Sequence, residues 1–350
     1  GVLGVEIGRS DSPGIGPGSE ASLARWLIGG LSARSVSIGR IDKLGGGAIQ
    51  ENYALDVDVS GGPHAGAQKL VLRTDAPSGV AVSHSRSQEF ALLKTAHAAG
   101  VTVPEPLALC TDKAVMGRPF YVMRRVGGTA AGHILIRDDR WKGDRRALAD
   151  RLGRELAKIH SIRPPRDDLA FLPVPRQAPA LEAIAGYRRW LDTYRAPRPA
   201  LEWGLRWLER HAPASGDLVL SHRDFRTGNY MVDEQGLTGI LDWEFAGWGD
   251  PHEDLGWLCS RCWRFGANTR EAGGIGERAD FIAGYERQSG RKVDAAAVRY
   301  WETMAHARWA TIAIQQGERH VGGVEPSLDL ALTGRRVAEL EYQLLRMTTP

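Results

Sequence analysis

The stretch of residues 218–254, LVLSHRDFRTGNYMVDEQGLTGILDWEFAGWGDPHED, constrains the fold more than any other part of the chain. The polar turn DEQG separates two short apolar runs, at residues 230–232 and 237–241, and this pattern predicts a β-hairpin. In a hairpin the outer ends of the two strands lie side by side. We therefore expect Asn229 and Asp242, which flank the hairpin, to come close together.

Oxygen-bearing side chains gather around the expected hairpin. Asp224 lies on the loop just before it, so two carboxylates and one amide oxygen would meet without any thiol, which is the donor set that Mg²⁺ prefers. The spacing His-x-Asp-x-x-x-x-Asn, followed by a strand-borne Asp, is the arrangement found in kinases. On this interpretation Asp224 is the catalytic base, Asn229 and Asp242 are metal ligands, and His222 braces the loop by hydrogen bonding. The alternative is that Asp, Asn and Gly collect here only because they favour turns.

Two segments carry a family resemblance. HRDFRTGNYMVD at residues 222–233 and ILDWEFAGWGDPHEDLGWL at residues 240–258 resemble the signature of the aminoglycoside phosphotransferase and choline kinase-like superfamily of small-molecule kinases. The resemblance covers roughly residues 35–345 and is dense only in this central stretch. It implies an α+β, bilobal protein-kinase-like fold with a small antiparallel β-rich N-lobe and a larger, mainly helical C-lobe. It also implies ATP and Mg²⁺ as cofactors and a small-molecule hydroxyl as the phosphate acceptor.

A glycine-rich turn after the first expected strand is the candidate phosphate cover. Gly45, Gly46 and Gly47 would let backbone N–H groups approach a triphosphate closely, although most glycine clusters are simply turns. The family usually has Ser-Asn shortly afterwards, where this chain has Ile49 and Gln50, so backbone contacts are the expected ones. No Walker A pattern occurs in the sequence, which removes the main rival phosphate loop.

The resemblance implies further nucleotide contacts at four positions. Arg73 ends the third expected strand, where kinases ordinarily have the lysine that holds the α- and β-phosphates, and Glu89 in the next helix is its expected partner. The alternative for Arg73 is a solvated residue at a strand end. Met123 and Val126 mark the approximate positions where backbone groups would bond the adenine edge.

The remaining elements follow from periodicity and turn residues. Strands are expected at residues 38–44, 53–59, 69–73, 107–109 and 119–123, of which the first three form an antiparallel meander. Helices are expected at residues 21–31, 86–99, 145–160, 181–190, 201–211, 278–288, 294–316 and 328–346. These elements suggest a flexible lead-in at residues 1–24, a nucleotide-binding N-lobe at 25–125, and a catalytic and substrate-binding C-lobe at 126–350.

Several acidic and histidine residues outside the motif have structural interpretations. Asp250 and Asp254 resemble family positions that tie the following helix to the catalytic loop, and they would also cap that helix without any function. Glu244, two residues beyond Asp242 on the same expected strand face, either joins the metal shell or faces solvent. His160 is expected to cap or pack at the end of its helix.

Composition limits the classes of partner. The 350 residues carry a formal net charge of +3 and no dense block of Lys and Arg, so nucleic acid is not an expected partner. No apolar run approaches the length of a membrane span, and residues 1–20 lack a secretory signal, which predicts a cytoplasmic protein without a membrane partner. The three cysteines cannot form a disulfide framework. Cys259 and Cys262 are better explained as buried apolar residues of a helix than as a zinc or redox pair.

Charge and resemblance both bear on the acceptor. Residues 270–350 hold eleven Asp and Glu against eleven Lys and Arg, a balance that does not suit a polycationic aminoglycoside. The segment LDWEFAGWGDPHEDLGWLC looks more like kinase domains associated with acyl-CoA dehydrogenases, for which a hydroxyacyl substrate is implied. We therefore expect phosphorylation of a hydroxyl on a neutral or anionic small molecule. The alternative is an aminoglycoside or other antibiotic O-phosphotransferase.

Two other classes of function stay open for this sequence. His222, Asp224, His252 and Asp254 could supply the ligands of a two-metal hydrolase that binds zinc or manganese without nucleotide. A nucleotide-binding pseudokinase without catalysis is compatible with the altered glycine loop and with Arg73, although the intact motif argues against it.

Overall fold

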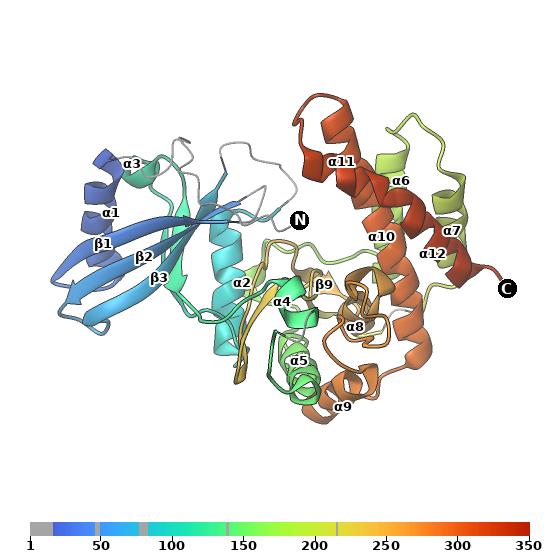
Figure 1. The fold of residues 1–350 in the computed structure, drawn as a ribbon, viewed down its shortest axis with the longest axis horizontal. Helices are drawn as coiled ribbons and strands as arrows, with labels where there is room; N and C mark the ends of the chain where they lie inside the picture. Colours follow the sequence, from blue (N-terminus) through green and yellow to red (C-terminus); the bar gives the residue numbers. More distant parts are fainter. Residues whose placement is uncertain (1–16, 46–49, 77–82, 138–139, 215) are drawn as a thin grey trace. The chain divides into compact units, whose positions relative to one another are not determined.

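An antiparallel sheet is the first architectural feature of the chain (Figure 1). The computed structural model describes residues 17–45, 50–76, 83–137, 140–214 and 216–350. Within these residues the sheet has five strands in the order β1-β2-β3-β5-β4, and each neighbouring pair is antiparallel. The strands are β1 (Ser35–Leu44), β2 (Gln50–Ser60), β3 (Gly66–Asp75), β4 (Pro106–Cys110) and β5 (Phe120–Arg124). The expected meander is confirmed, and each of its three strands extends beyond the predicted range.

Helix α1 (Pro17–Gly30) begins earlier than expected and belongs to the core of the sheet. Leu23, Leu27 and Leu31 recur every four residues, so they share one face, and each is at most 1% exposed where it packs with the strands. The predicted flexible lead-in is therefore wrong for residues 17–24, because burying this apolar stripe outweighs the turn-forming tendency of the preceding Gly, Pro and Ser. The rest of the predicted lead-in lies outside the described residues.

Contacts divide the described chain into two compact units, which we call the sheet unit and the helical unit. The sheet unit runs to Phe90 and resumes at Glu105–Arg125, and the helical unit comprises Ala91–Pro104 and Val126–Pro350. The sequence pattern places residues 91–104 with the sheet, but they belong to the helical unit. The reason is local: the Thr102 N–H donates to the buried Glu155 at 2.7 Å, and the Thr102 carbonyl accepts from Ile240 at 2.9 Å.

The helical unit is built around one long helix. Its helices are α4 (Gly132–Ile136), α5 (Arg145–Ile159), α6 (Pro179–Leu191), α7 (Pro199–Arg210), α8 (Pro251–Cys259), α9 (Arg278–Ser289), α10 (Ala295–Val321), α11 (Leu328–Arg335) and α12 (Val337–Thr348). Helix α2 (Arg86–Ala98) spans the boundary between the units, and the short α3 (Lys113–Met116) belongs to the sheet unit. The 27-residue α10 packs against α7, α8, α11 and α12 (Figure 1). Within the described residues, no helix combines the length and the apolar composition that crossing a membrane requires.

The predicted continuous helix at residues 328–346 is wrong. The chain forms α11 and α12 instead, with a turn at Arg336 between them. Helix α11 approaches α10 so closely that a Cβ built on Gly334 would lie 2.9 Å from the Cα of Gly317. Helix α12 packs against α7 and α10, with Leu344 fully buried. Both helices therefore contact α10, but only α12 also packs against α7, and the turn at Arg336 separates them.

The apolar segment after Asp254 also differs from the prediction of one helix. Helix α8 ends at Cys259, and a single 3₁₀ turn, η2 (Arg261–Trp263), follows. Cys259 is fully buried and Cys262 is partly buried, and burial raises the pKa of both thiols to about 12. Both therefore behave as small apolar groups rather than as reactive thiols.

Two short pairs of strands complete the helical unit. The predicted hairpin is present as β7 (Tyr230–Asp233) and β8 (Gly236–Ile240). On either side of it along the chain, β6 (Val219–Ser221) pairs with β9 (Gly247–Gly249). The loop that carries His222 and Asp224 lies between β6 and β7, so both of its ends are anchored in strands.

Candidate active site

The hairpin brings the two ends of the motif together. Tyr230 pairs with Ile240, and just beyond this pair the Leu241 N–H donates to the Asn229 carbonyl at 2.8 Å. Asn229 and Asp242 therefore flank the same end of the hairpin, as the spacing predicts.

Asp242 does not lie on the strand, and here the prediction is wrong. Strand β8 ends at Ile240, and Asp242 has a φ of 58°, in the left-handed region that non-glycine residues rarely adopt. A turn at residues 244–245 follows, so Glu244 does not share a strand face with Asp242. Strain of this kind persists only where the surrounding structure enforces it, and it occurs often at functional sites.

Asp224 is held by three side chains, two from its own loop and one from α8. Asn229 donates its amide N–H to Asp224 Oδ2 at 2.6 Å, and Arg226 Nε and Trp257 Nε1 each donate to Oδ1 at 3.1 Å. Burial alone would raise the pKa of this carboxyl, but the positive charges of Arg226 and Arg308 outweigh burial and lower it. Asp224 is therefore ionised at neutral pH and can accept a proton or a hydrogen bond.

The two arginines near Asp224 lie over tryptophan rings. The guanidinium carbon of Arg226 is 4.4 Å from the ring centre of Trp263, and that of Arg308 is 4.3 Å from the ring centre of Trp257. Stacking of this kind fixes the plane of each guanidinium and adds cation–π attraction. Sequence reasoning missed all four residues. Arg226 and Trp257 lie within the two segments that carry the resemblance, but their residue types gave no signal of a contact with Asp224.

His222 is fully buried and braces the loop. Its Nδ1 accepts the Asp224 N–H at 3.2 Å, so the proton of a neutral ring is on Nε2, which donates to the Leu241 carbonyl at 2.8 Å. Both ring nitrogens are thus engaged with backbone, one on each side of the hairpin. This is the bracing role expected from the sequence.

Asp254 ties helix α8 to the same loop. Its carboxylate accepts the N–H groups of His222 and Arg223, each at 2.8 Å, and the side chain is fully buried. Burial alone would raise the pKa of Asp254, but the hydrogen bond and charge of His160 outweigh burial and lower it. Asp250 instead caps α8, because its Oδ1 accepts the His252 N–H at 2.7 Å. The two acidic residues have the structural roles that their positions suggest.

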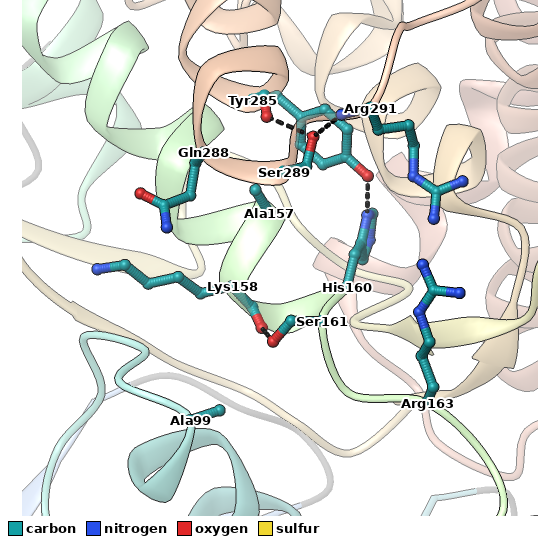
Figure 2. A pocket seen from close by; sticks show the side chains of 10 residues that line it. All are labelled: Ala99, Ala157, Lys158, His160, Ser161, Arg163, Tyr285, Gln288, Ser289 and Arg291. Atoms are coloured by element: carbon teal, nitrogen blue, oxygen red, sulfur yellow. Dashed lines mark hydrogen bonds between the residues drawn. The ribbon is translucent and has the colours of Figure 1, made fainter.

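His160 does more than cap its helix. It follows the last turn of α5, where its Nε2 lies 2.9 Å from the Asp254 carboxylate. Its Nδ1 lies 2.7 Å from the Tyr285 hydroxyl (Figure 2). Tyr285, on α9, is itself fully buried. Helices α5, α8 and α9 are therefore joined to the loop that carries Asp224 by one hydrogen-bonded chain. No local sequence signal links residues so far apart.

A cavity of about 320 Å³ opens beside His160 and Tyr285 (Figure 2). Lys158, Arg163 and Arg291 line it. Lys158 is paired with the buried Glu155 at 2.9 Å, and both arginines lie within 3.5 Å of the Asp217 carboxylate. These cations also sit near the carboxyl ends of α5 and α9, which carry negative partial charge. Their contacts are those of a structural network.

The sheet unit carries the expected pair of Arg73 and Glu89. Arg73 Nε lies 2.5 Å from Glu89 Oε1, and the two side chains are 7% and 2% exposed. Arg86 also pairs with Glu89, at 2.8 Å, and the Tyr121 hydroxyl donates to it. Burial alone would raise the pKa of Glu89, but Arg73 and Arg86 outweigh burial and lower it. The alternative of a solvated strand-end arginine is wrong.

Other predicted nucleotide positions lie in the sheet unit or at its boundary. Gly46 and Gly47 lie outside the described residues. A Cβ built on Gly45 would meet nothing within 4 Å, so packing does not require glycine there. Met123 lies on β5 and pairs with Val71 on β3. Val126 is the first residue of the helical unit after β5. Their contacts with a nucleotide stay predictions.

The histidine geometry disfavours a two-metal hydrolase. His252 Nδ1 lies 3.0 Å from Asp250, and its Nε2 accepts the Asp294 N–H at 3.2 Å, so both nitrogens of His252 are engaged, as both are in His222. In the part of the chain that the structure describes, no group of three or more His, Cys, Asp or Glu side chains is arranged to hold a metal ion.

An antiparallel sheet with a buried Arg–Glu pair, followed by a helical unit with a braced His-Arg-Asp loop, is the organisation of the kinase-like α+β fold. The chain belongs to the phosphotransferase enzyme family, whose family model matches residues 40–295. Both the fold class and the family expected from the sequence are confirmed.

Curated relatives are much longer proteins. Acyl-CoA dehydrogenase family member 10 of Mus musculus is 31% identical over 209 residues, which are 55% of this chain and 18% of that protein. Acyl-CoA dehydrogenase family member 11 of Rattus norvegicus is 28% identical over 311 residues, which are 81% of this chain and 38% of that protein. The chain thus spans well under half the length of these relatives.

Solved structures share the fold at low identity. A protein from Ralstonia eutropha JMP134, assigned provisionally to the aminoglycoside phosphotransferases, has a TM-score of 0.71 and 21% identity, covering 94% of this chain and 97% of that one. Aminoglycoside phosphotransferase APH(4)-Ia, in a ternary complex with ADP and hygromycin B, has a TM-score of 0.60 and 16% identity, covering 94% of this chain and 99% of that one.

Proposed function

We propose that this chain is an ATP-dependent phosphotransferase that moves the γ-phosphoryl group to a hydroxyl of a small molecule. The observation that carries the proposal is the state of Asp224. This carboxylate is ionised, is oriented by Asn229, Arg226 and Trp257, and stands on a loop braced by Asp254. A pre-oriented carboxylate of this kind suits a reaction in which positioning supplies most of the rate.

Asp224 is assigned to the acceptor hydroxyl. The hydroxyl oxygen attacks the γ-phosphorus, the bond from that phosphorus to the bridging oxygen breaks, and ADP leaves. Asp224 orients the hydroxyl and accepts its proton as the new P–O bond forms. The lowered pKa makes Asp224 a weak base, so orientation is its larger contribution.

Asn229 and Asp242 are the residues that would hold Mg²⁺. The donor set fits: Asn229 contacts Asp224 through its amide nitrogen and also carries an amide oxygen, and Asp242 follows at the same end of the hairpin. Amide and carboxylate oxygens are hard ligands of the kind that this ion prefers. When bound, the metal would neutralise charge on the phosphate oxygens.

The nucleotide is assigned to residues around Arg73. Glu89 fixes the Arg73 guanidinium from one side, and Gln50 Oε1 accepts from its Nη2 at 3.1 Å. Asn52 Oδ1 accepts from Arg73 Nη1 at 3.4 Å, so the guanidinium is held in one orientation, and its planar positive charge suits phosphate oxygens. The backbone near Gly45, Gly46 and Gly47 would cover the phosphates, and the backbone near Met123 and Val126 would meet the adenine.

The surroundings of Asp224 favour a neutral or anionic acceptor. Arg226 and Arg308 add positive charge beside it. Glu253 Oε1 lies 3.7 Å from Arg223 Nε, and burial raises the pKa of this carboxyl. A raised pKa favours the neutral form, so Glu253 offsets less of the positive charge. A polycation would meet repulsion here. Since the curated relatives are acyl-CoA dehydrogenase family members, a hydroxyacyl compound is the acceptor class that we propose.

A substrate panel tests the proposal. Mg²⁺-dependent ADP release is measured with hydroxy acids, hydroxyacyl thioesters and aminoglycosides. We expect turnover with a hydroxyacyl compound, and the D224N variant should lower kcat by about 10²- to 10⁴-fold. The control is E234Q, which removes an exposed carboxylate from the hairpin turn and should leave turnover unchanged.

Two other results of the substrate panel would each replace part of this proposal. Turnover of aminoglycosides alone would replace the hydroxyacyl assignment with antibiotic phosphorylation. Nucleotide binding without turnover of any acceptor would replace catalysis with a pseudokinase role.

A further inference from the structure

The peptide that links Arg223 to Asp224 is unusually constrained. Arg223 has a φ of 64°, in the left-handed region, so the backbone just before the proposed catalytic carboxylate costs free energy to hold. Such a conformation persists only if neighbouring groups determine it. The hydrogen bonds around this peptide identify those groups.

Two of the constraints come from the braced loop described above. The Arg223 N–H donates to Asp254 at 2.8 Å, and the Asp224 N–H donates to His222 Nδ1 at 3.2 Å. The third constraint comes from elsewhere. Arg308, near the middle of α10, donates from Nη1 to the Arg223 carbonyl, so the peptide between Arg223 and Asp224 is held at both its C=O and its N–H.

Arg308 also reaches the Asp224 carboxylate through a ring. Its guanidinium carbon lies 4.3 Å from the centre of the Trp257 ring, and Trp257 Nε1 donates to Asp224 Oδ1 at 3.1 Å. Trp257 is 3% exposed, so it has little room to move if the guanidinium stays in place. One side chain thus contacts both the backbone and the hydrogen-bond donor that orient Asp224.

We propose that Arg308 is a positioning residue for Asp224, setting the preceding peptide by a hydrogen bond and the carboxylate through the Trp257 indole. The inference rests on the proposed function for its effect on turnover. Its structural part, the fixing of the loop by α10, holds independently of any acceptor. Helix α10 therefore acts together with α8, the first through Arg308 and the second through Asp254.

Two substitutions separate the parts of this role. R308M keeps an unbranched apolar stem but removes the guanidinium with its charge and its donors, and R308K restores the charge without the planar stack. We expect R308M to lower kcat by about 10- to 100-fold with the nucleotide KM within about twofold of wild type, because a displaced carboxylate affects chemistry rather than binding. R308K should recover part of that loss.

Two readouts distinguish positioning from a general loss of structure. The loss in R308M should fall on kcat and not on the nucleotide KM, whereas a general loss of structure would change both constants. Hydrogen exchange at the Asp224 amide should be at least about tenfold faster in R308M, because its peptide loses one anchor. The control is R299M, at an exposed position on the same helix, where neither quantity should change.

The outcomes separate the two proposals. Faster exchange in R308M in a protein that turns over no acceptor would support the positioning role and contradict the proposed function. Wild-type exchange and wild-type kcat in R308M would overturn the positioning role. An equal loss of kcat in R308M and R308K, with wild-type exchange at the Asp224 amide in both, would also overturn it in favour of simple packing on Trp257.

Discussion

At the scale of single residues, Asp254 is the buried group that joins helices α5 and α8 to the loop carrying Asp224. One fully buried carboxylate accepts hydrogen bonds from the His222 N–H, the Arg223 N–H and His160 Nε2. Losing the charge would leave these donors poorly matched in a region that water does not reach. Removing one partner from such a buried arrangement is far more costly than removing an exposed ion pair.

We predict that D254N lowers the free energy of unfolding by about 3 kcal/mol at pH 7. The folded-state pKa of Asp254 is below its ordinary value, so the stabilisation is present above the unfolded pKa of about 4 and is lost as pH falls through the folded pKa. Urea unfolding should therefore show a constant difference from wild type between about pH 5 and pH 8 and a smaller one below about pH 4. A difference that grows on acidification would contradict this account.

At the scale of elements, glycines set how closely the helices approach one another. Helix α5 meets α9 at Gly153, where an added Cβ would lie 2.1 Å from the Phe281 carbonyl oxygen, and α10 meets α11 at Gly317 and Gly334. Backbone atoms form these contacts, so they cannot move aside as flexible side chains can. Close helix packing in this unit therefore depends on a few small residues.

We predict that G334A destabilises the protein by about 1–3 kcal/mol, because its methyl group would be 2.9 Å from the Gly317 Cα and would push α11 away from α10. The control is G186A on α6, where the nearest atom to the new Cβ, apart from the helix's own backbone, is an Arg189 side-chain nitrogen at 3.8 Å. That change should be neutral or stabilising by up to about 1 kcal/mol, because alanine favours helix. Equal effects of both substitutions in urea unfolding would refute the packing argument.

Local patterns predicted the elements better than the contacts between them. Strand alternation and the turn DEQG were enough for the meander and the hairpin, and the motif spacing placed Asn229 and Asp242 at one end of that hairpin. The turn at Arg336 could not be predicted, because local sequence does not reveal that α12 packs against α7 as well as α10. Trp257 and Arg308 reach Asp224 from distant parts of the chain, and only the packing of α8 and α10 reveals them.

At the scale of the whole molecule, the proposed roles divide between the two units. The sheet unit holds the Arg73–Glu89 pair assigned to the nucleotide, and the helical unit holds the loop assigned to the acceptor and the metal. Steady-state kinetics can test this division, because loss of nucleotide binding raises KM and loss of a chemical role lowers kcat.

We predict that R73M raises the KM for ATP by about tenfold or more, because a charge-assisted contact to phosphate is lost. Its effect on kcat at saturating ATP should be smaller. D224N should do the opposite, lowering kcat while the KM for ATP stays within about twofold of wild type. Steady-state kinetics at fixed acceptor concentration measure both. An equal effect of R73M and D224N on both constants would argue against separate roles.

The most direct test of the central claim is the affinity of the protein–nucleotide complex for a divalent ion. Electron paramagnetic resonance can count bound Mn²⁺, a substitute for Mg²⁺, in the presence of a non-hydrolysable ATP analogue. We predict that N229A and D242N each weaken Mn²⁺ binding by about tenfold or more, while E234Q binds it as wild type does. Wild-type Mn²⁺ affinity in both N229A and D242N would contradict the assignment of this hairpin end as the metal site.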